Sequence, residues 1–372
     1  MIDLLEVRNS SRVLCGVIDD AKSIIWVAEY YGAGSFEVYA PIHNKELLQE
    51  GFYITRTGAK EAAIIESVQL IDSDTEGLMV IATGRMLKSI LDRRLAYSLS
   101  GTVITPVKMS GDLATAVQGV VNAHAGAGAG AVRSMGVVIG SAGGIDKEIT
   151  SASDEESSRQ SSYKGLLEFT DSVLQEFGCG SMMRIDADTL DIVYDLYEGK
   201  DRSIDNTDGN VPVIFSQDFE NLISAQYVHD TTALKNFALI GGEGQGVDRF
   251  FATYAETAST GLERREVFVD AASYPRKYYE GETEHTYTDA EYTAQLIGQA
   301  QTELKELIVT ETFTGEISLE KSSYRYGVDF ELGDIVTISD RQLGVYINAR
   351  ILTATEVQDD GGYILSVEYG NI

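Results

Sequence analysis

The sequence has 372 residues, and 44% of them are hydrophobic, a share typical of a packed soluble protein and well above that of a disordered chain. It carries 58 acidic and 29 basic residues, which gives a formal net charge of −29. Because so acidic a chain repels phosphate, sequence-independent nucleic-acid binding is excluded as a main function. The length allows two or three domains, each with a core of its own.

The N-terminal residues and the cysteines indicate in which cellular compartment the chain is made. Residues Met1 to Glu6 lack the basic start and long apolar run of a secretion signal. No stretch approaches the ~18 uncharged apolar residues of a membrane span. Cys15 and Cys179 are too few for a disulfide scaffold. We therefore expect a soluble chain without a membrane span, and free, buried thiols made in a reducing compartment.

Residues 1–105 are expected to form a β-barrel-like module of strands joined by tight turns. Short apolar or alternating runs predict strands at 24–30, 35–40, 63–70 and 78–82. The polar segment 72–77 separates the last two strands, which predicts a hairpin with a polar tip.

Beyond this hairpin the period of the pattern changes from that of a strand to that of a helix. We expect Gly84 to break the second strand of the hairpin. The apolar residues after it recur at helical spacing and predict a helix: Met86, Leu87, Ile90, Leu91 and Leu95.

Residues 106–205 differ in character and are expected to form an α/β insert. Ser110-Gly111-Asp112 precedes a plausible amphipathic helix that begins at Leu113, and the alanine- and glycine-rich run 123–130 is interpreted as a mobile loop. The segment 154–158 is another polar stretch. A second helix is predicted over 166–177, with Gly178 at its end.

Residues 206–372 are expected to form a second β-rich module. Strands are predicted at 237–240, 250–254, 266–269, 335–338, 346–351 and 363–367. Thr288 and Glu291 have the spacing of a capping box, which starts one long helix over 288–308. The fold class is therefore mainly β with an α/β insert (α+β), built from two small β-barrel-like modules with helical material between them.

The glycine-rich segment 241–246 is the feature most similar to a phosphate-binding loop. It lacks the Gly-Lys-Ser/Thr ending, and the strand at 250–254 follows where a helix would be needed. Glu243 would also repel phosphate. The pattern favours a hairpin turn over nucleotide binding.

Two acidic loops resemble calcium loops only in part. Residues 186–191 lack the glycine at the sixth position, and residues 201–210 lack the closing bidentate glutamate. Solvated loops are favoured at both places. The four histidines are scattered, which gives no local metal motif: His43, His124, His229 and His285.

We expect no catalytic, cofactor-binding or metal-binding residues. His229 and Asp230 could be half of an acid–base pair, but neighbours in a strand point to opposite faces. There is no Gly-x-Ser-x-Gly elbow and no motif around either cysteine. Carboxylate pairs of the glycosidase type remain open in a chain with 58 acids. Catalysis is therefore the less favoured reading.

Tyrosine-rich segments near strand edges are candidates for contact surface. They are Tyr278-Tyr279 and Tyr324-Arg325-Tyr326. Tyr and Arg are enriched at the cores of interfaces, which fits an assembly protein. Ordinary barrel edges explain the same residues nearly as well.

Several phrases, in their order and spacing along nearly the whole chain, resemble the siphophage tail-hub family, a Gp37-like group related to the N-terminal part of tail-associated proteins. The phrases are 36–41 (FEVYAP), 48–54 (LQEGFYI), 64–68 (IIESV), 83–87 (TGRML), 91–94 (LDRR), 241–246 (GGEGQG) with Arg249, 326–336 (YGVDFELGDIV) and the terminal Tyr369-Gly370.

The resemblance implies a virion structural protein of the baseplate or tail tip, assembled in the host cytoplasm. Members are similar to contractile-tail baseplate hubs, in which a homotrimer with two barrel-like modules per subunit makes a pseudo-sixfold ring. Such a ring joins the sixfold tail tube, through a distal tail protein, to a threefold tip. The implied partners also include the tape measure protein and tip, spike or receptor-binding proteins, with DNA only in transit during ejection. The resemblance further implies a bare hub, without an added enzyme or receptor-binding domain, and no cofactor.

The motif residues are expected to be structural. Gly84 and Gly333 can adopt turn geometries closed to other residues. Arg93 and Arg94, on a helix of an acidic protein, are candidates for pairing with carboxylates within or between subunits.

Two classes of function remain. The first is the structural hub, and the second is a tail-tip enzyme or carbohydrate-binding module that acts on the cell envelope. The net charge bears on the structural hub, because DNA would pass through a ring whose lumen wall is acidic, whereas a basic wall would hold it. We expect more Asp and Glu than Lys and Arg in the lumen of the ring. The competing explanation is that the acids only solvate the outer face.

Overall fold

The computed structural model describes residues 4–100, 103–149, 159–161, 163–280, 283–317 and 322–370. The chain divides into two compact units, the first made of Met1–Tyr227 with Phe313–Ile372 and the second of Val228–Thr312. The mainly β, α+β fold class predicted from the sequence is confirmed. The predicted domain boundaries near residues 105 and 205 stay predictions.

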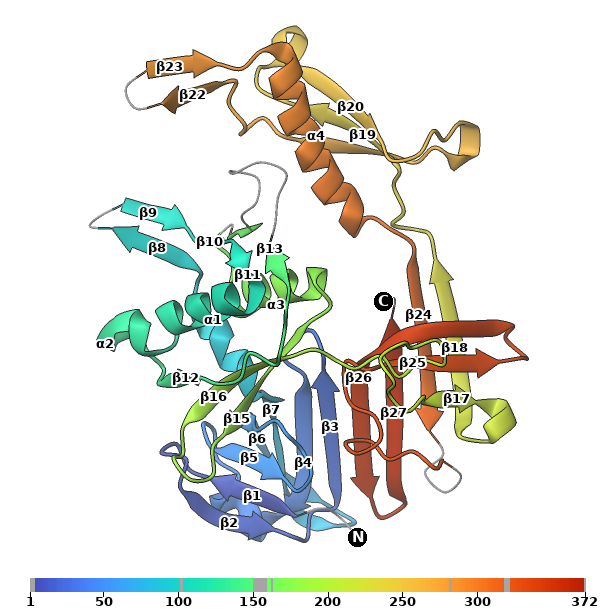
Figure 1. The fold of residues 1–372 in the computed structure, drawn as a ribbon. Helices are drawn as coiled ribbons and strands as arrows, with labels where there is room; N and C mark the ends of the chain where they lie inside the picture. Colours follow the sequence, from blue (N-terminus) through green and yellow to red (C-terminus); the bar gives the residue numbers. More distant parts are fainter. Residues whose placement is uncertain are drawn as a thin grey trace. The chain divides into compact units, whose positions relative to one another are not determined.

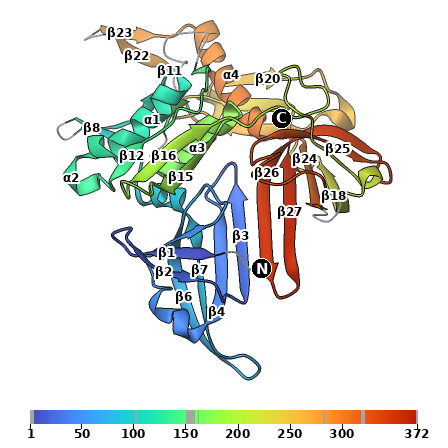
Figure 2. The ribbon, with the colours of Figure 1, turned by 60° about the horizontal axis from the view of Figure 1, so that its bottom comes forward.

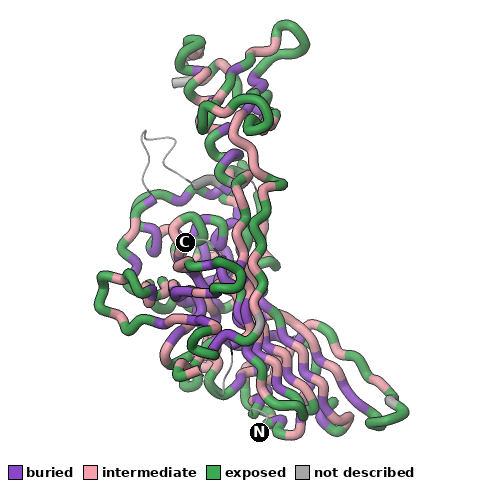
Figure 3. Tube along the Cα trace, turned by 90° about the vertical axis from the view of Figure 1, so that its right-hand side faces the viewer, coloured by how far each residue is buried: buried purple, intermediate pink, exposed green. Residues whose placement is uncertain are grey.

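The first module of unit one is an antiparallel sheet in the order β3-β4-β7-β6-β5-β1-β2, curved around one apolar core (Figure 1). Its strands are β1 (Leu5–Arg8), β2 (Leu14–Ile18), β3 (Ser23–Glu29), β4 (Ser35–Pro41), β5 (Tyr53–Arg56), β6 (Ala63–Ser73) and β7 (Gly77–Met86). Buried and more exposed positions alternate along these strands (Figure 3). The inward residues include Trp26, Phe36 and Val38. The alternation in the sequence therefore selects the face that packs.

The second module has the strand order β17-β25-β26-β27-β24-β18 around a core rich in aromatic residues. The strands are β17 (Ile214–Ser216), β18 (Leu222–Asp230), β24 (Thr310–Ile317), β25 (Ile335–Asp340), β26 (Val345–Asp359) and β27 (Gly362–Gly370). Phe215 lies within 5.2 Å of Phe330 and 6.1 Å of Tyr369, measured between ring centroids. Edge-to-face and tilted contacts of this kind add to the burial of the rings.

One long strand, β26, joins the two modules into a continuous sheet (Figure 2). Its first part, from Val345 to Arg350, pairs with β25 of the second module. Its last part, from Thr353 to Asp359, pairs with β3 of the first module. The register with β27 shifts between Ile351 and Thr353, at the point where β26 passes from one module to the other.

The insert contributes two amphipathic helices and several short sheets. The helices are α1 (Leu113–His124), α2 (Gly130–Arg133) and α3 (Leu166–Glu176). The strands are β8 (Tyr97–Ser100), β9 (Val103–Pro106), β10 (Lys108–Met109), β11 (Gly111–Asp112), β12 (Val137–Ile139), β13 (Glu148–Ile149), β14 (Arg159–Gln160), β15 (Gly180–Ile185) and β16 (Ile192–Tyr197). The apolar sides of α1 and α3 share one core with the sheet β12-β16-β15. Asp112 caps α1 by accepting a hydrogen bond from the Thr115 amide (2.8 Å).

Unit two packs a mixed three-stranded sheet, in the order β20-β19-β21, against one long helix. Its elements are β19 (Phe237–Gly241), β20 (Phe251–Ala255), β21 (Glu266–Asp270), β22 (Lys277–Glu280), β23 (Thr283–Thr286) and α4 (Asp289–Glu306). The predicted capping box is confirmed, since Thr288 and Glu291 each accept from the other's backbone amide. Tyr292, Leu296, Ala300 and Leu304 of α4 recur at helical spacing and are buried in the core of this unit.

Two local predictions around Gly84 are wrong. Gly84 does not break the strand but lies inside β7, where an added Cβ would come within 2.0 Å of the Ile64 carbonyl oxygen of β6. The residue is therefore needed for close approach at the bulge of β6 and not for a turn. The predicted helix after it is a 3-10 helix, η2 (Leu87–Arg93), and Leu95 lies beyond it with 53% of its surface exposed. Helical spacing over so few residues does not distinguish the two helix types.

The run 123–130 is more regular than a loop. Helix α1 continues to His124, and the 3-10 helix η3 (Ala127–Ala129) and α2 follow at once. The polar segment 154–158 lies outside the described residues. The remaining 3-10 helices are η1 (Ile42–Glu46), η4 (Gln217–Phe219), η5 (Gly246–Asp248) and η6 (Gly261–Glu263).

Candidate functional site

Tyr30 follows β3, and its contacts reach the insert and the second module as well as the first module. Its hydroxyl donates to the carbonyl of Gly178 (2.9 Å) and accepts from the amide of Gly199 (3.3 Å). Its own amide donates to the carbonyl of Leu352 in β26 (2.8 Å). The ring is fully buried, and burial raises the pKa of the phenol well above its usual value. Tyr30 thus fixes three parts of the unit by one neutral side chain.

Glycines surround the Tyr30 ring because nothing larger fits there. A Cβ added at Gly180 would lie 2.5 Å from the ring, and one at Gly333 would lie 2.3 Å from it. Gly333 also has a φ of +89°, so the expected turn geometry at this residue is confirmed. Gly199 is closer still to its neighbour, since its added Cβ would meet the Gly333 carbonyl oxygen at 1.9 Å.

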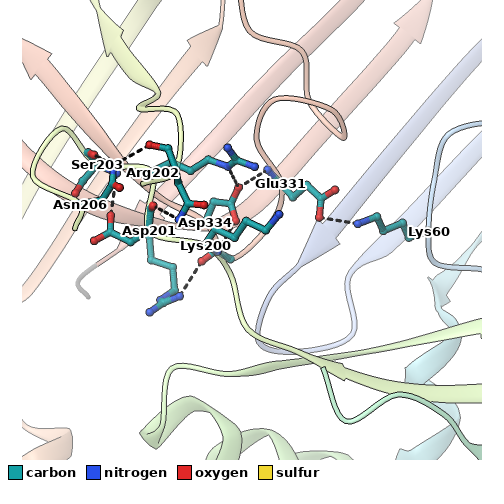
Figure 4. A network of polar contacts seen from close by, with 11 residues as sticks. Lys60, Lys200, Asp201, Arg202, Ser203, Asn206, Glu331 and Asp334 are labelled. Carbon is teal, nitrogen blue, oxygen red and sulfur yellow. Dashed lines mark hydrogen bonds and ion pairs between the residues drawn. The ribbon is translucent and has the colours of Figure 1, made fainter. Parts of the chain in front are cut away.

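Asp334, next to Gly333, ties the segment at 200–203 to the second module (Figure 4). One carboxylate oxygen accepts from the Lys200 amide (2.7 Å), and the other accepts from the Arg202 guanidinium (2.8 Å) and the Glu331 amide (3.0 Å). Burial raises the pKa of Asp334, although these donors act in the opposite direction. The phrase 326–336 is therefore a structural corner whose carboxylate is already occupied by protein donors.

Arg350 of β26 completes the corner. Its guanidinium donates to the Gly333 carbonyl (2.7 Å) and lies 5.6 Å from the centroid of the Tyr30 ring. A guanidinium over an aromatic ring gains a cation–π attraction that is stronger when the pair is desolvated. Arg350 and Tyr30 are both buried, so this attraction is of the desolvated, stronger kind.

A second buried contact joins β5 of the first module to β26. Arg56 and Glu356 form an ion pair in which only 4% and 9% of the side-chain surface is exposed. The Tyr363 hydroxyl also donates to Glu356, and the Arg56 guanidinium lies 5.4 Å from the centroid of the Trp26 ring. Closer to the surface, Lys60 and Glu331 form an ion pair at 2.6 Å (Figure 4).

Three buried charged side chains, Lys88 and Glu61 of the first module and Asp171 of the insert, lie where these two parts meet. The Lys88 ammonium is fully buried and donates to the carbonyls of Ser181 (3.1 Å) and Glu29 (3.3 Å). Asp171 accepts from the Gly32 amide (2.9 Å), and its pKa is raised by burial. Glu61 is buried with neither carboxylate oxygen hydrogen-bonded to a described residue, and burial raises its pKa to about 7.

The candidate sites named from the sequence are structural in the described residues. The glycine-rich segment connects the antiparallel strands β19 and β20, as expected for a hairpin. The Arg249 side chain fills it, donating to the carbonyls of Gly241 (2.7 Å) and Gly242 (3.0 Å) and pairing with Asp270. The space that a phosphate cradle would need is occupied by this guanidinium.

The two acidic loops are held by their own backbone and by neighbouring cations. Asp186 accepts from the amides of Thr189 and Asp188 and pairs with Arg184, and these donors lower its pKa to about 2. In the second loop the Asp201 carboxylate accepts from the Ser203 amide (2.8 Å). In the described part of the chain, no three His, Cys, Asp or Glu side chains form a group able to hold a metal ion.

The histidine, arginine and cysteine interpretations have mixed outcomes. His229 pairs with Glu311 at 3.0 Å, and not with its neighbour Asp230. Within the described chain the guanidinium of Arg94 donates to the backbone carbonyls of Arg133 and Arg93. Pairing of Arg93 or Arg94 with a carboxylate of another subunit stays a prediction. Arg85 pairs with carboxylates within the chain, those of Glu66 (2.9 Å) and Asp92 (2.8 Å).

Both cysteines are free thiols, but Cys15 is exposed and only Cys179 is buried. Cys15 lies on β2, at the end of the strand order, where one side of the strand has no neighbour in the sheet as described. Tyr324 and Tyr326 pack against the core of the second module, and Tyr278 stacks on Tyr287 within unit two. The side chain of Tyr279 lies outside the described residues.

Comparison with known proteins assigns the sequence to a family. The model of the family described as "Siphovirus ReqiPepy6 Gp37-like protein" matches residues 4–371. The chain belongs to this Gp37-like family. The matched range includes the phrases that contain Gly84, Gly333 and Asp334. No curated protein matches the chain.

Solved structures share the fold of this Gp37-like chain. The tail protein from Neisseria meningitidis MC58 is 12% identical with a TM-score of 0.58, and the match covers 100% of this chain and 97% of that one. The 43 kDa tail protein of prophage MuSo2 from Shewanella oneidensis is 11% identical with a TM-score of 0.57, covering 100% and 98%. Both likenesses extend over essentially the whole chain and show that its fold is that of these two tail proteins.

The helices of the Gp37-like chain are short or polar. Over the residues described, none is both long and apolar enough to cross a membrane.

Proposed function

We propose that the chain is a structural hub of a phage tail tip or baseplate, located in the virion and assembled in the host cytoplasm. Three copies form a ring that joins the sixfold tail tube, through a distal tail protein, to a threefold tip. The tape measure protein and the tip, spike or receptor-binding proteins are its other proposed partners, and DNA passes through the ring without being bound specifically. Family membership and the fold shared with two tail proteins support this proposal.

The observation that carries the proposal is the pairing of β3 with β26. It joins two barrel-like modules, each with its own core, side by side in one sheet. A threefold ring of such subunits presents six similar modules, which is what a sixfold tube requires of an adaptor. A closed ring also leaves no interface open to further growth.

The deciding experiment is a cryo-electron microscopy map of the intact tail, combined with the mass of the purified protein in solution. We expect three copies at the tip, with the two modules of each alternating around the axis. A map with one copy, or with six equivalent copies, at this level would refute the ring.

The hub is proposed to have no catalytic role of its own. Two buried carboxylates, those of Asp334 and Glu356, are each occupied by protein donors. Purified protein is expected to leave peptidoglycan and surface polysaccharide intact. Turnover that disappears on substitution of a single carboxylate would instead establish the alternative, a tail-tip enzyme acting on the cell envelope.

A further inference from the structure

The hairpin of β8 and β9 in the insert is an isolated two-stranded sheet with one apolar face. Tyr97 lies opposite Pro106 and Leu99 lies opposite Ile104, so these four residues share one side of the hairpin. We call them the β8–β9 apolar face. Ser98 lies opposite Thr105 and Ser100 lies opposite Val103 on the other side, which is polar except for Val103. The pattern is therefore that of a sheet with one face to be covered and one to be solvated.

The apolar face is open in the described structure. Leu99 and Ile104 have 61% and 57% of their surface exposed, although they form the centre of the face. A lone two-stranded hairpin is only marginally stable in water, and contiguous exposed apolar residues mark interaction surfaces. The hairpin is nevertheless held firmly at its base. His124 lies 2.9 Å from the Tyr97 carbonyl oxygen, and the Arg133 guanidinium stacks 4.4 Å from the Tyr97 ring centroid.

The charge around the hairpin is opposite to that of the rest of the chain. The 53 residues from 93 to 145 contain one acidic residue, Asp112, and four basic ones, Arg93, Arg94, Lys108 and Arg133, a net charge of +3. The other 319 residues contain 57 acidic and 25 basic residues, a net charge of −32. Two of the four cations are held at the base of the hairpin, because Arg94 donates to the Arg133 carbonyl and Arg133 donates to the Leu95 carbonyl (both 2.7 Å).

We infer that the β8–β9 apolar face docks on an acidic surface of a second copy of this chain. The complementary partner is a surface that is apolar at its centre and negative at its rim, and the remaining 319 residues of another copy supply negative charge in excess. Two such faces would not dock on each other, because both carry the cations. The contact is therefore between different surfaces of the two copies, the kind that closes into a ring.

This inference rests on the proposed trimer and adds a specific contact to it. The test compares two double variants of the full chain by sedimentation equilibrium. Leu99→Asp with Ile104→Asp places two carboxylates on the apolar face, and Ser98→Asp with Thr105→Asp places them on the opposite face of the same two strands. We expect the first variant to be monomeric at concentrations where the wild type is trimeric, with the dissociation constant raised at least about a hundredfold, and the second to remain trimeric.

The outcomes separate this inference from the hub itself. A trimer that survives Leu99→Asp with Ile104→Asp overturns the docking surface and leaves the hub in place. A wild type that is trimeric neither in solution nor in the particle overturns the hub. Loss of the trimer in both double variants overturns the assignment to one face. Because all four positions are exposed, circular dichroism is expected to show the same subunit fold in each variant.

A second measurement does not depend on introduced charge. A photo-crosslinking amino acid at position 99 is expected to capture a second copy of the chain, at a peptide outside residues 93–145. The same amino acid at position 98 is the control and is expected to give little product. Capture of a different tail protein alone, or of lipid alone when anionic vesicles are present, would overturn the inference.

Discussion

Arg56 of β5 and Glu356 of β26 form a buried ion pair although 300 positions separate them in the chain. The pair crosses from the first module to the strand that belongs to both. Breaking one partner of a buried pair leaves an uncompensated charge in a low-dielectric site, whereas replacing both by apolar residues removes the charge altogether.

We therefore expect Glu356→Gln to lower the free energy of unfolding by about 3 kcal/mol. Arg56→Met with Glu356→Leu should recover most of this loss. Chemical denaturation of the three proteins at neutral pH measures both effects. A double variant as unstable as the single one would show that the pair acts through its hydrogen bonds, including that from Tyr363, and not through its charges.

The close approach of Gly333 to Tyr30 predicts a second stability effect. Gly333→Ala combines a positive φ with a Cβ 2.3 Å from a ring that has no room to move, and should cost about 3 kcal/mol. Gly327 is the matched control, because its φ is +79° but nothing lies within 4 Å of its added Cβ. Gly327→Ala should cost only about 1 kcal/mol. Equal losses would mean that backbone strain alone, and not the Tyr30 contact, requires Gly333.

Glu61 predicts a pH dependence of stability. Its pKa of about 7 in the folded chain lies above the ordinary value of 4.5, so the folded state holds a proton that the unfolded state has released between these values. The contribution of Glu61 to stability is complete below about pH 4.5 and is lost as the pH rises toward 7. Its total is about 3 kcal/mol, since each pKa unit corresponds to about 1.4 kcal/mol.

Glu61→Gln keeps the shape of the protonated acid and removes its titration. The variant should be more stable than the wild type at pH 8, and the difference should shrink toward zero as the pH falls below about 4.5. Thermal unfolding of both proteins across this range measures the difference. Asp171 also has a raised pKa, and its charge is one of the causes that raise the pKa of Glu61, so the difference reports Glu61 together with its coupling to Asp171. A difference that does not change with pH would contradict the assignment.

The charge of the chain predicts the electrostatics of the assembled ring. Charges further apart than ~8 Å are largely screened at physiological salt, so only acids on the lumen wall act on passing DNA. We expect more Asp and Glu than Lys and Arg on that wall. A trimer map with a neutral or basic lumen, and with the acids on the outside, would leave the net charge of −29 without a role in DNA passage.

Local patterns in the sequence determined much of the secondary structure. The alternation at 35–40, the hairpin of β6 and β7 and the capping box of α4 each depend on residues close together in the chain, and the structure confirms them. The same holds for the turn at 241–246, because the missing lysine and the strand after it are local facts. Resemblance of ordered phrases then indicated the Gp37-like family, to which the chain belongs.

Only the tertiary structure decided what the motif residues do. A glycine such as Gly84 often marks the end of a strand. Here β7 needs a glycine in its interior because the Ile64 carbonyl of the neighbouring strand comes too close for a Cβ. Within the described chain Arg85, and not Arg94, pairs with carboxylates because Glu66 lies beside it across the β6–β7 ladder. Tyr30 gave no local signal at all, since its partners lie 148 and 169 positions away. Spacing in sequence records periodicity along one element, whereas these contacts depend on which distant elements the cores bring together.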